Sequence, residues 1–132
     1  MKGEITGLGG VFIKCKNPAQ QKSWYKEMLG ISFDDGSNAH IFNWKEYDLG
    51  KPAGLTVFSF FKDSSSYFDP SNSEFMINFR VKNLEALYRQ LQKNGIQTIG
   101  EIEVYPYGKF AWILDPDGRK VELWEAITES EK

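Results

Sequence analysis

An internal repeat constrains the fold of this chain more than any other feature of the sequence. The segment VFIKCKN at 11–17 matches INFRVKN at 77–83 with a constant offset of 66 residues. In both copies, an alternating apolar segment typical of a strand leads to an Asn where a helix is expected to begin. Gly30 and Gly95 follow the two predicted helices, and glycine is the residue that most commonly ends a helix. The chain is therefore predicted to contain two related units.

Each unit is predicted to have the order strand, helix and then three strands. The segments expected to be extended are 9–16, 31–33, 40–44, 54–61, 75–82, 96–105 and the two arms of a hairpin around 115–118, and the helices are expected from Pro18 to about Leu29 and after Asn83.

The polar stretch between the units is rich in Ser, Asp and Pro and is expected to be a connector. We thus predict one α+β domain over residues 1–132, built of two tandem βαβββ modules around a shared curved-sheet pocket. Its predicted parts are module one at about 5–62, the connector at 62–74 and module two at about 75–128.

The last hairpin places a carboxylate where burial is expected. DPDG at 115–118 has Pro second and Gly fourth, as a type I turn prefers, and aromatic and β-branched residues lie on both sides. In the second arm, Leu123 and its neighbours of equal parity face one side, while Glu122 and Trp124 face the other. Because a buried carboxylate is costly without a partner, the interaction of Glu122 becomes the central question.

Composition favours a cytosolic globular domain. Hydrophobic residues make up 41% and charged residues 26% of the chain, and the net charge of −2 gives no electrostatic reason to bind nucleic acid or an acidic membrane. One Cys and one His do not supply a disulfide or a site with several histidines. The sequence shows neither a signal-peptide pattern nor a long apolar run.

Strand alternation predicts one side-chain face that lines a pocket and an opposite face that packs under the helices. The predicted lining combines aromatic walls with a few polar groups, as small-molecule sites do. The candidate ligand-binding residues are Phe12, Lys14, Phe58, Phe60, Asn78, Arg80, Trp112, Glu122 and Trp124. For Glu122, three roles remain open: an ion pair with Arg80 or Lys14, contact with a ligand or catalysis, and residual metal binding.

The chain resembles the vicinal oxygen chelate superfamily, which includes glyoxalase I, bleomycin-resistance proteins and extradiol dioxygenases. The resemblance extends over GLGGVFIKCKNPAQQKSWYKEMLGI, FMINFRVKNLEAL and AWILDPDGRKVELWE, and the last segment is the most specific. It implies paired βαβββ modules that enclose one pocket, where catalytic members hold a divalent metal. The hairpin glutamate, here Glu122, is commonly one of the ligands.

The resemblance also implies the positions of the other metal ligands, and none carries a usual ligand. These positions correspond to Gly10, Met76 and Phe58, which leaves Glu122 alone. Since zinc sites usually need three or four protein ligands, we expect no metal cofactor, with a divalent metal as the less favoured alternative.

Three functions follow as hypotheses. The first is a metal-free protein that binds a small aromatic or apolar molecule between the modules, as bleomycin-resistance relatives do. The second is a lyase, isomerase or dioxygenase of the glyoxalase type that uses Glu122, and the third is a protein-interaction module with a filled pocket. The resemblance also suggests a homodimer.

Overall fold

The computed structural model describes residues 2–34, 36–45 and 52–127, which form a mixed α+β fold around one sheet. The remaining residues of the predicted domain, including 128–132, lie outside the described residues. Neither helix in the described part has the length and apolar character needed to cross a bilayer. The elements are β1 (Glu4–Cys15), α1 (Pro18–Leu29), β2 (Ala39–Lys45), β3 (Pro52–Lys62), β4 (Phe75–Lys82), α2 (Leu84–Lys93), β5 (Glu103–Tyr105), β6 (Gly108–Leu114) and β7 (Lys120–Ala126).

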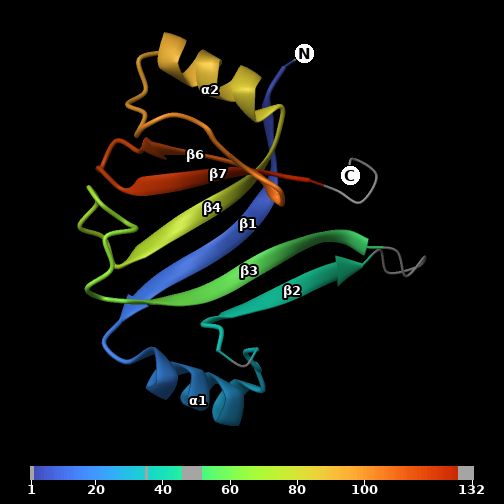
Figure 1. Cartoon of the computed structure of the whole chain (residues 1–132), viewed down its shortest axis with the longest axis vertical. Coiled ribbons are helices and arrows are strands. Elements are labelled where there is room, and N and C mark those ends of the chain that lie inside the picture. Colours follow the sequence, from blue (N-terminus) through green and yellow to red (C-terminus); the bar gives the residue numbers. More distant parts are fainter. Residues whose placement is uncertain (1, 35, 46–51, 128–132) are drawn as a thin grey trace.

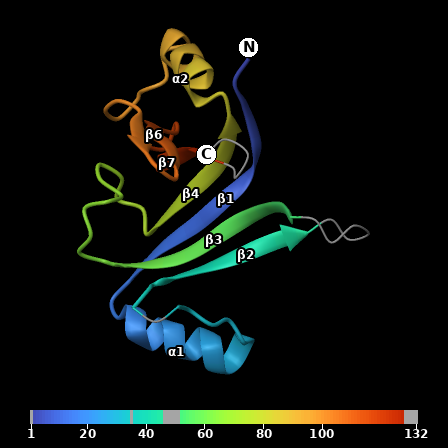
Figure 2. The ribbon, with the colours of Figure 1, turned by 45° about the vertical axis from the view of Figure 1, so that its right-hand side comes forward.

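The strand order confirms the two tandem modules. The sheet runs β2-β3-β1-β4-β7-β6-β5, so the first strands of the modules, β1 and β4, pair with each other in its middle. Each first strand also pairs in parallel with the last strand of its own module, β3 or β7. The helices α1 and α2 consequently lie at opposite ends of a long twisted sheet (Figures 1 and 2).

The two helices begin differently, although Asn precedes both. In α1 the Asn17 side chain accepts a hydrogen bond from the backbone N–H of Gln20 (3.1 Å), as predicted. Asn83 instead has φ 60° and makes no such bond. Asn83 is at the predicted N-cap position of α2, but its side chain does not cap the helix: the carboxylate of Glu125 on β7 accepts the N–H of Leu84 instead (2.9 Å).

Two predicted strands differ from the observed ones. Residues 31–33 do not form a strand, so within the described residues module one has two strands after its helix. In the segment 96–105, only Glu103–Tyr105 is a strand, preceded by an isolated bridge between Thr98 and Ile113. Gly100 has φ 70°, and this left-handed backbone interrupts the extended chain between the two pairings.

The helix-facing side of the sheet is largely as predicted in module two. Val81, Ala111 and Leu123 are buried against Leu84 and Tyr88 of α2. The register carries the same face across the middle of the sheet, where Val11 pairs with Ile77 and Ile77 pairs with Val121.

The predicted face of Phe58 and Phe60 in β3 is wrong. Phe58 pairs with Val11, and both phenyl rings lie about the Tyr25 ring of α1, at 5.4 and 5.1 Å between centroids. The alternate residues of β3, Val57, Ser59 and Phe61, therefore lie on the same face of the sheet as Phe12. Shifting a strand by one residue moves every side chain to the opposite face of the sheet. The alignment of the internal repeat is one residue off in β3, so it assigns Phe58 and Phe60 to the wrong face.

This placement predicts a large stability effect for Phe60→Ala. Phe60 is only 2% exposed beneath α1, so its truncation should lower the free energy of unfolding by about 3 kcal/mol. Phe75→Ala is the matched control, since Phe75 is 45% exposed on β4 and its truncation should cost less than about 1 kcal/mol. Urea unfolding of both variants measures the difference, and similar losses would contradict the assignment of Phe60 to the core under α1.

Candidate functional site

One row of side chains across the sheet brings Glu122 together with its neighbours. Asn78 of β4 lies directly beside Glu122 of β7, and Trp112 of β6 lies directly on its other side. The row continues on β1 at Gly10, which pairs with Asn78. Because paired residues in a sheet point to the same face, all three side chains project from the face opposite the helices.

The carboxylate of Glu122 is buried and accepts three hydrogen bonds. Glu122 is 2% exposed. Asn78 Nδ2 donates to Oε1 at 2.6 Å, and Trp112 Nε1 donates to Oε2 at 2.8 Å. The hydroxyl of Tyr67 donates to the same Oε2. An ionised carboxylate is an acceptor with room for several donors, so this environment suits a charged Glu122.

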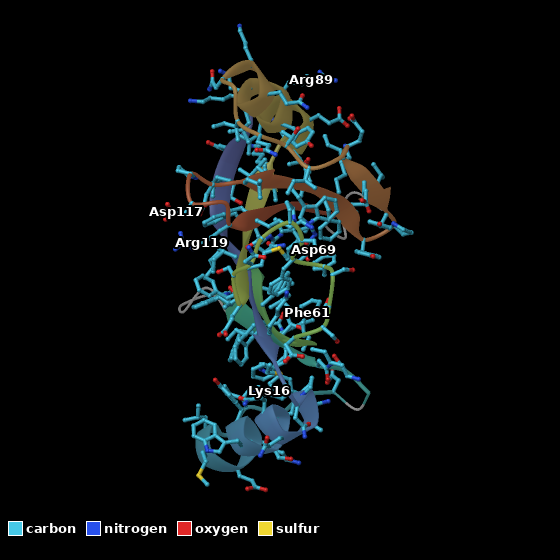
Figure 3. All side chains as sticks on the ribbon, turned by 90° about the vertical axis from the view of Figure 1, so that its left-hand side faces the viewer. Lys16, Phe61, Asp69, Arg89, Asp117 and Arg119 are labelled. Carbon is cyan, nitrogen blue, oxygen red and sulfur yellow. The ribbon has the colours of Figure 1, made fainter. Side chains whose placement is uncertain are left out.

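Tyr67 comes from the connector, which folds back over this face of the sheet. Its ring stacks on Phe61 of β3 at 5.5 Å and meets Trp112 edge-on at 6.4 Å. The next residue, Phe68, is fully buried and also contacts the Phe61 ring, at 5.3 Å. In Figure 3 the connector, with Asp69 labelled, crosses in front of the sheet near Phe61. Apolar anchoring of this aromatic pair therefore brings the Tyr67 hydroxyl to Glu122.

Burial and charge both favour the protonated form of Tyr67. Burial raises the pKa of the Tyr67 hydroxyl, and the charge of Glu122 and their hydrogen bond raise it further. Tyr67 thus remains a hydrogen-bond donor over the ordinary pH range.

Asn78 is held in place from both sides. Its Nδ2 reaches Glu122, while Oδ1 lies against Gly9, where any Cβ would collide with it. Oδ1 has no hydrogen-bond partner among the described residues, although the side chain is buried. Gly9 thus leaves the space that Asn78 needs to present its N–H donors to the carboxylate.

A cleft with a volume of about 540 Å³ opens beside Tyr67 and Trp112, within the size range of small-molecule sites. Its lining comes from the connector and module two: Ser66, Tyr67, Ile99, Gly100, Glu103, Tyr105, Tyr107, Phe110, Trp112 and Lys120. Five of these residues are aromatic. The rings of Tyr105 and Tyr107 are parallel with centroids 5.4 Å apart, and the Tyr105 hydroxyl donates to Glu103.

The structure distributes the nine predicted ligand-binding residues over several places. Trp112 lines the cleft, Glu122 and Asn78 lie behind it, and Phe12 is buried with Phe68 and Met76. Phe58 and Phe60 are on the other face, under α1. The remaining residues pack in cation–π pairs: the Lys14 ammonium lies 5.0 Å from the Phe68 ring, and the Arg80 guanidinium lies 5.2 Å from the Trp124 ring. Neither cation forms an ion pair with Glu122 within the described part of the chain.

The sequence analysis missed Tyr67 and Lys120. Lys120 is two residues before Glu122, so the alternation that placed Glu122 on the pocket face places Lys120 there too. The signal for Tyr67 was weaker, namely an aromatic pair, Tyr67-Phe68, inside an otherwise polar connector. The contact of Tyr67 with Glu122 spans 55 residues and has no local signature.

The residues near Glu122 do not fit the divalent metal that the family resemblance implies. Both carboxylate oxygens already accept hydrogen bonds from neutral donors. Gly10 and Met76 have no ligand atom suited to such an ion, and the pairing places Ser59, rather than Phe58, in the position that matches Glu122. Among the described residues, no three His, Cys, Asp or Glu side chains gather to hold a metal ion.

Solved structures share this fold over nearly the whole chain. Methylmalonyl-CoA epimerase from Mycobacterium tuberculosis superposes with a TM-score of 0.57 at 19% identity, covering 96% of this chain and 91% of that one. Methylmalonyl-CoA epimerase from Streptomyces coelicolor, in complex with 2-nitronate-propionyl-CoA, gives 0.65 at 13% identity, covering 95% and 100%. A glyoxalase/bleomycin resistance protein/dioxygenase superfamily member from Vibrio splendidus gives 0.55 at 15% identity, covering 89% and 98%. At such identities the likeness shows the fold alone.

Sequence comparison establishes the family. No curated protein matches the chain significantly. The model of the Glyoxalase/Bleomycin resistance protein/Dioxygenase superfamily matches residues 7–123, which include both modules and the connector. The chain therefore belongs to the glyoxalase/bleomycin resistance protein/dioxygenase superfamily.

Proposed function

We propose that this chain is a metal-free small-molecule-binding protein of its superfamily. Its ligand has an aromatic or apolar body and occupies the cleft between the connector and module two. The observation that carries the proposal is that the buried Glu122 accepts hydrogen bonds from Tyr67, Asn78 and Trp112, directly behind an aromatic cleft.

In this proposal Glu122 organises the cleft wall and does not take part in chemistry. Its Oε2 accepts hydrogen bonds from both Tyr67 and Trp112, which line the cleft, and so fixes the angle between their rings. A general base must lie within hydrogen-bond reach of the substrate proton. Glu122 is only 2% exposed and is not among the residues that line the cleft.

The ring arrangement supports a flat ligand. Phe110 and Trp112 both line the cleft, and their rings are within 16° of parallel. The Phe110 ring is also within 4° of parallel to that of Trp124, which does not line the cleft. Tyr107 lines the cleft and is 61% exposed. Binding against such rings stabilises aromatic molecules through area burial and ring–ring contact.

The first test is a melting-temperature screen of protein stripped with a chelator. We expect no stabilisation by zinc, manganese, nickel or ferrous ions, because the described residues offer Glu122 no partner ligands. An aromatic compound that binds should raise the melting temperature, since a ligand at a hundred times its Kd stabilises the folded state by about 2.7 kcal/mol. Metal stabilisation that disappears in Glu122→Ala would instead favour a metal-dependent lyase, isomerase or dioxygenase. No stabilisation by either the metal ions or the aromatic compounds would favour an interaction module with a filled pocket.

A second test places the ligand in the cleft. Tyr107→Ala should weaken binding of the best aromatic compound roughly fivefold, because it removes about 1 kcal/mol of ring contact. Trp24→Ala is the matched control: Trp24 is 50% exposed on α1 and does not line the cleft. Calorimetric titration measures both affinities. An equal loss in the two variants, or no loss in Tyr107→Ala, would place the ligand elsewhere.

A third test concerns the state of Glu122. Glu122→Gln keeps the size of the side chain but turns an N–H₂ group toward one of the three donors, so the free energy of unfolding should fall by about 2 kcal/mol. Glu85→Gln, which removes a surface ion pair between Glu85 and Lys109, should cost less than about 1 kcal/mol. Urea unfolding compares them. A loss in Glu122→Gln no larger than in the control would show that the carboxylate is not held by those donors.

A further inference from the structure

Lys120 places a positive charge inside the aromatic cleft. It shares the face of Glu122 on β7, and its Nζ donates to the backbone carbonyl of Tyr67 at 2.7 Å. The ammonium also lies 5.3 Å from the centre of the Tyr67 ring and 5.6 Å from the Trp112 ring. These contacts hold the charge at the junction of the connector and the sheet.

This charge has no carboxylate partner within ion-pair distance among the described residues. Three acidic residues act on it from further away: Glu122, Asp69 and Glu103. Glu122 already accepts three hydrogen bonds, and Glu103 accepts the Tyr105 hydroxyl. Burial lowers the pKa of Lys120, and the charge of Glu122 only partly opposes this effect.

An ammonium has three donors, and the described residues accept from one of them. The remaining donors are beside a cleft whose other walls are mainly aromatic. A ligand that carries an anionic acceptor would satisfy them at ion-pair distance, which Glu122, Asp69 and Glu103 do not reach. Charge-assisted hydrogen bonds of this kind are about twice as strong as neutral ones.

We propose that the cleft selects aromatic molecules that carry one carboxylate, which binds the ammonium of Lys120 while the ring lies against Tyr105, Tyr107 and Phe110. This inference rests on the proposed function and specifies its ligand class. Glu103 lines the same cleft, so its negative charge opposes a second acidic group on the ligand. The cleft therefore accepts a monoacid in preference to both the neutral analogue and the diacid.

The test uses three probes of one shape: a naphthalene monocarboxylate, the matching carboxamide and a naphthalene dicarboxylate. Calorimetric titration of the full chain at neutral pH and moderate salt measures each Kd. We expect the monocarboxylate to bind roughly tenfold more tightly than the carboxamide, as one charge-assisted hydrogen bond provides. The dicarboxylate should bind more weakly than the monocarboxylate.

Lys120→Met removes the charge and retains most of the side-chain length, so it should abolish the preference for the monocarboxylate while leaving carboxamide binding in place. Lys120→Arg should keep the preference. Lys14→Met is the matched control, because Lys14 also lies over an aromatic ring but outside the cleft. It should leave all three affinities unchanged.

The outcomes separate this inference from the proposed function. Equal binding of the monocarboxylate and the carboxamide by the unmodified chain would overturn the acid selectivity and leave the small-molecule function standing. A preference that survives Lys120→Met would overturn the role of Lys120. Binding of none of the probes would contradict the proposed function, and the inference would fall with it. The comparison of probes on the unmodified chain stays decisive even where a variant does not fold.

Discussion

The buried carboxylate of Glu122 is the constraint on which the rest of the site depends. A charge that is 2% exposed is costly unless donors surround it. The donors come from three separate places in the chain: β4, β6 and the connector. Their convergence ties the connector to module two and holds Tyr67 against Trp112. Loss of any donor would leave the buried charge less compensated and would lower the stability of the folded protein. The site and the local fold therefore stabilise one another.

The sheet register makes this convergence possible. Parallel pairing of β4 with β7 and antiparallel pairing of β7 with β6 place Asn78 and Trp112 on either side of Glu122. These two donors need no loop to position them. Tyr67 is positioned by the connector, and the burial of Phe68 anchors this part of the connector on the sheet. The aromatic cleft follows from the same contacts, because Tyr67 and Trp112 form part of its wall.

The sequence predicted the two-module α+β fold, the final hairpin and the face of Glu122, because these depend on local patterns. The phase of β3 could not be read in the same way. GLTVFSFF has large apolar residues at both parities, so alternation does not decide which face is buried, and the repeat places Phe58 rather than Ser59 opposite Glu122. The strand partners of Glu122, Asn78 and Trp112, could be predicted from the alternation of side chains along the strands. Tyr67 could not be, because a contact across 55 residues from a connector depends on how the whole chain folds.

The most direct test of the account is the indole N–H resonance of Trp112, assigned with Trp112→Phe and followed by NMR as zinc is added to chelator-treated protein. If Glu122 is held by its three donors, the resonance should exchange slowly with solvent and stay in place at every zinc concentration. An indole N–H that exchanges rapidly, or that shifts in a saturable way with zinc, would mean that the carboxylate is free to leave its donors for a metal. That result would contradict the metal-free binding site.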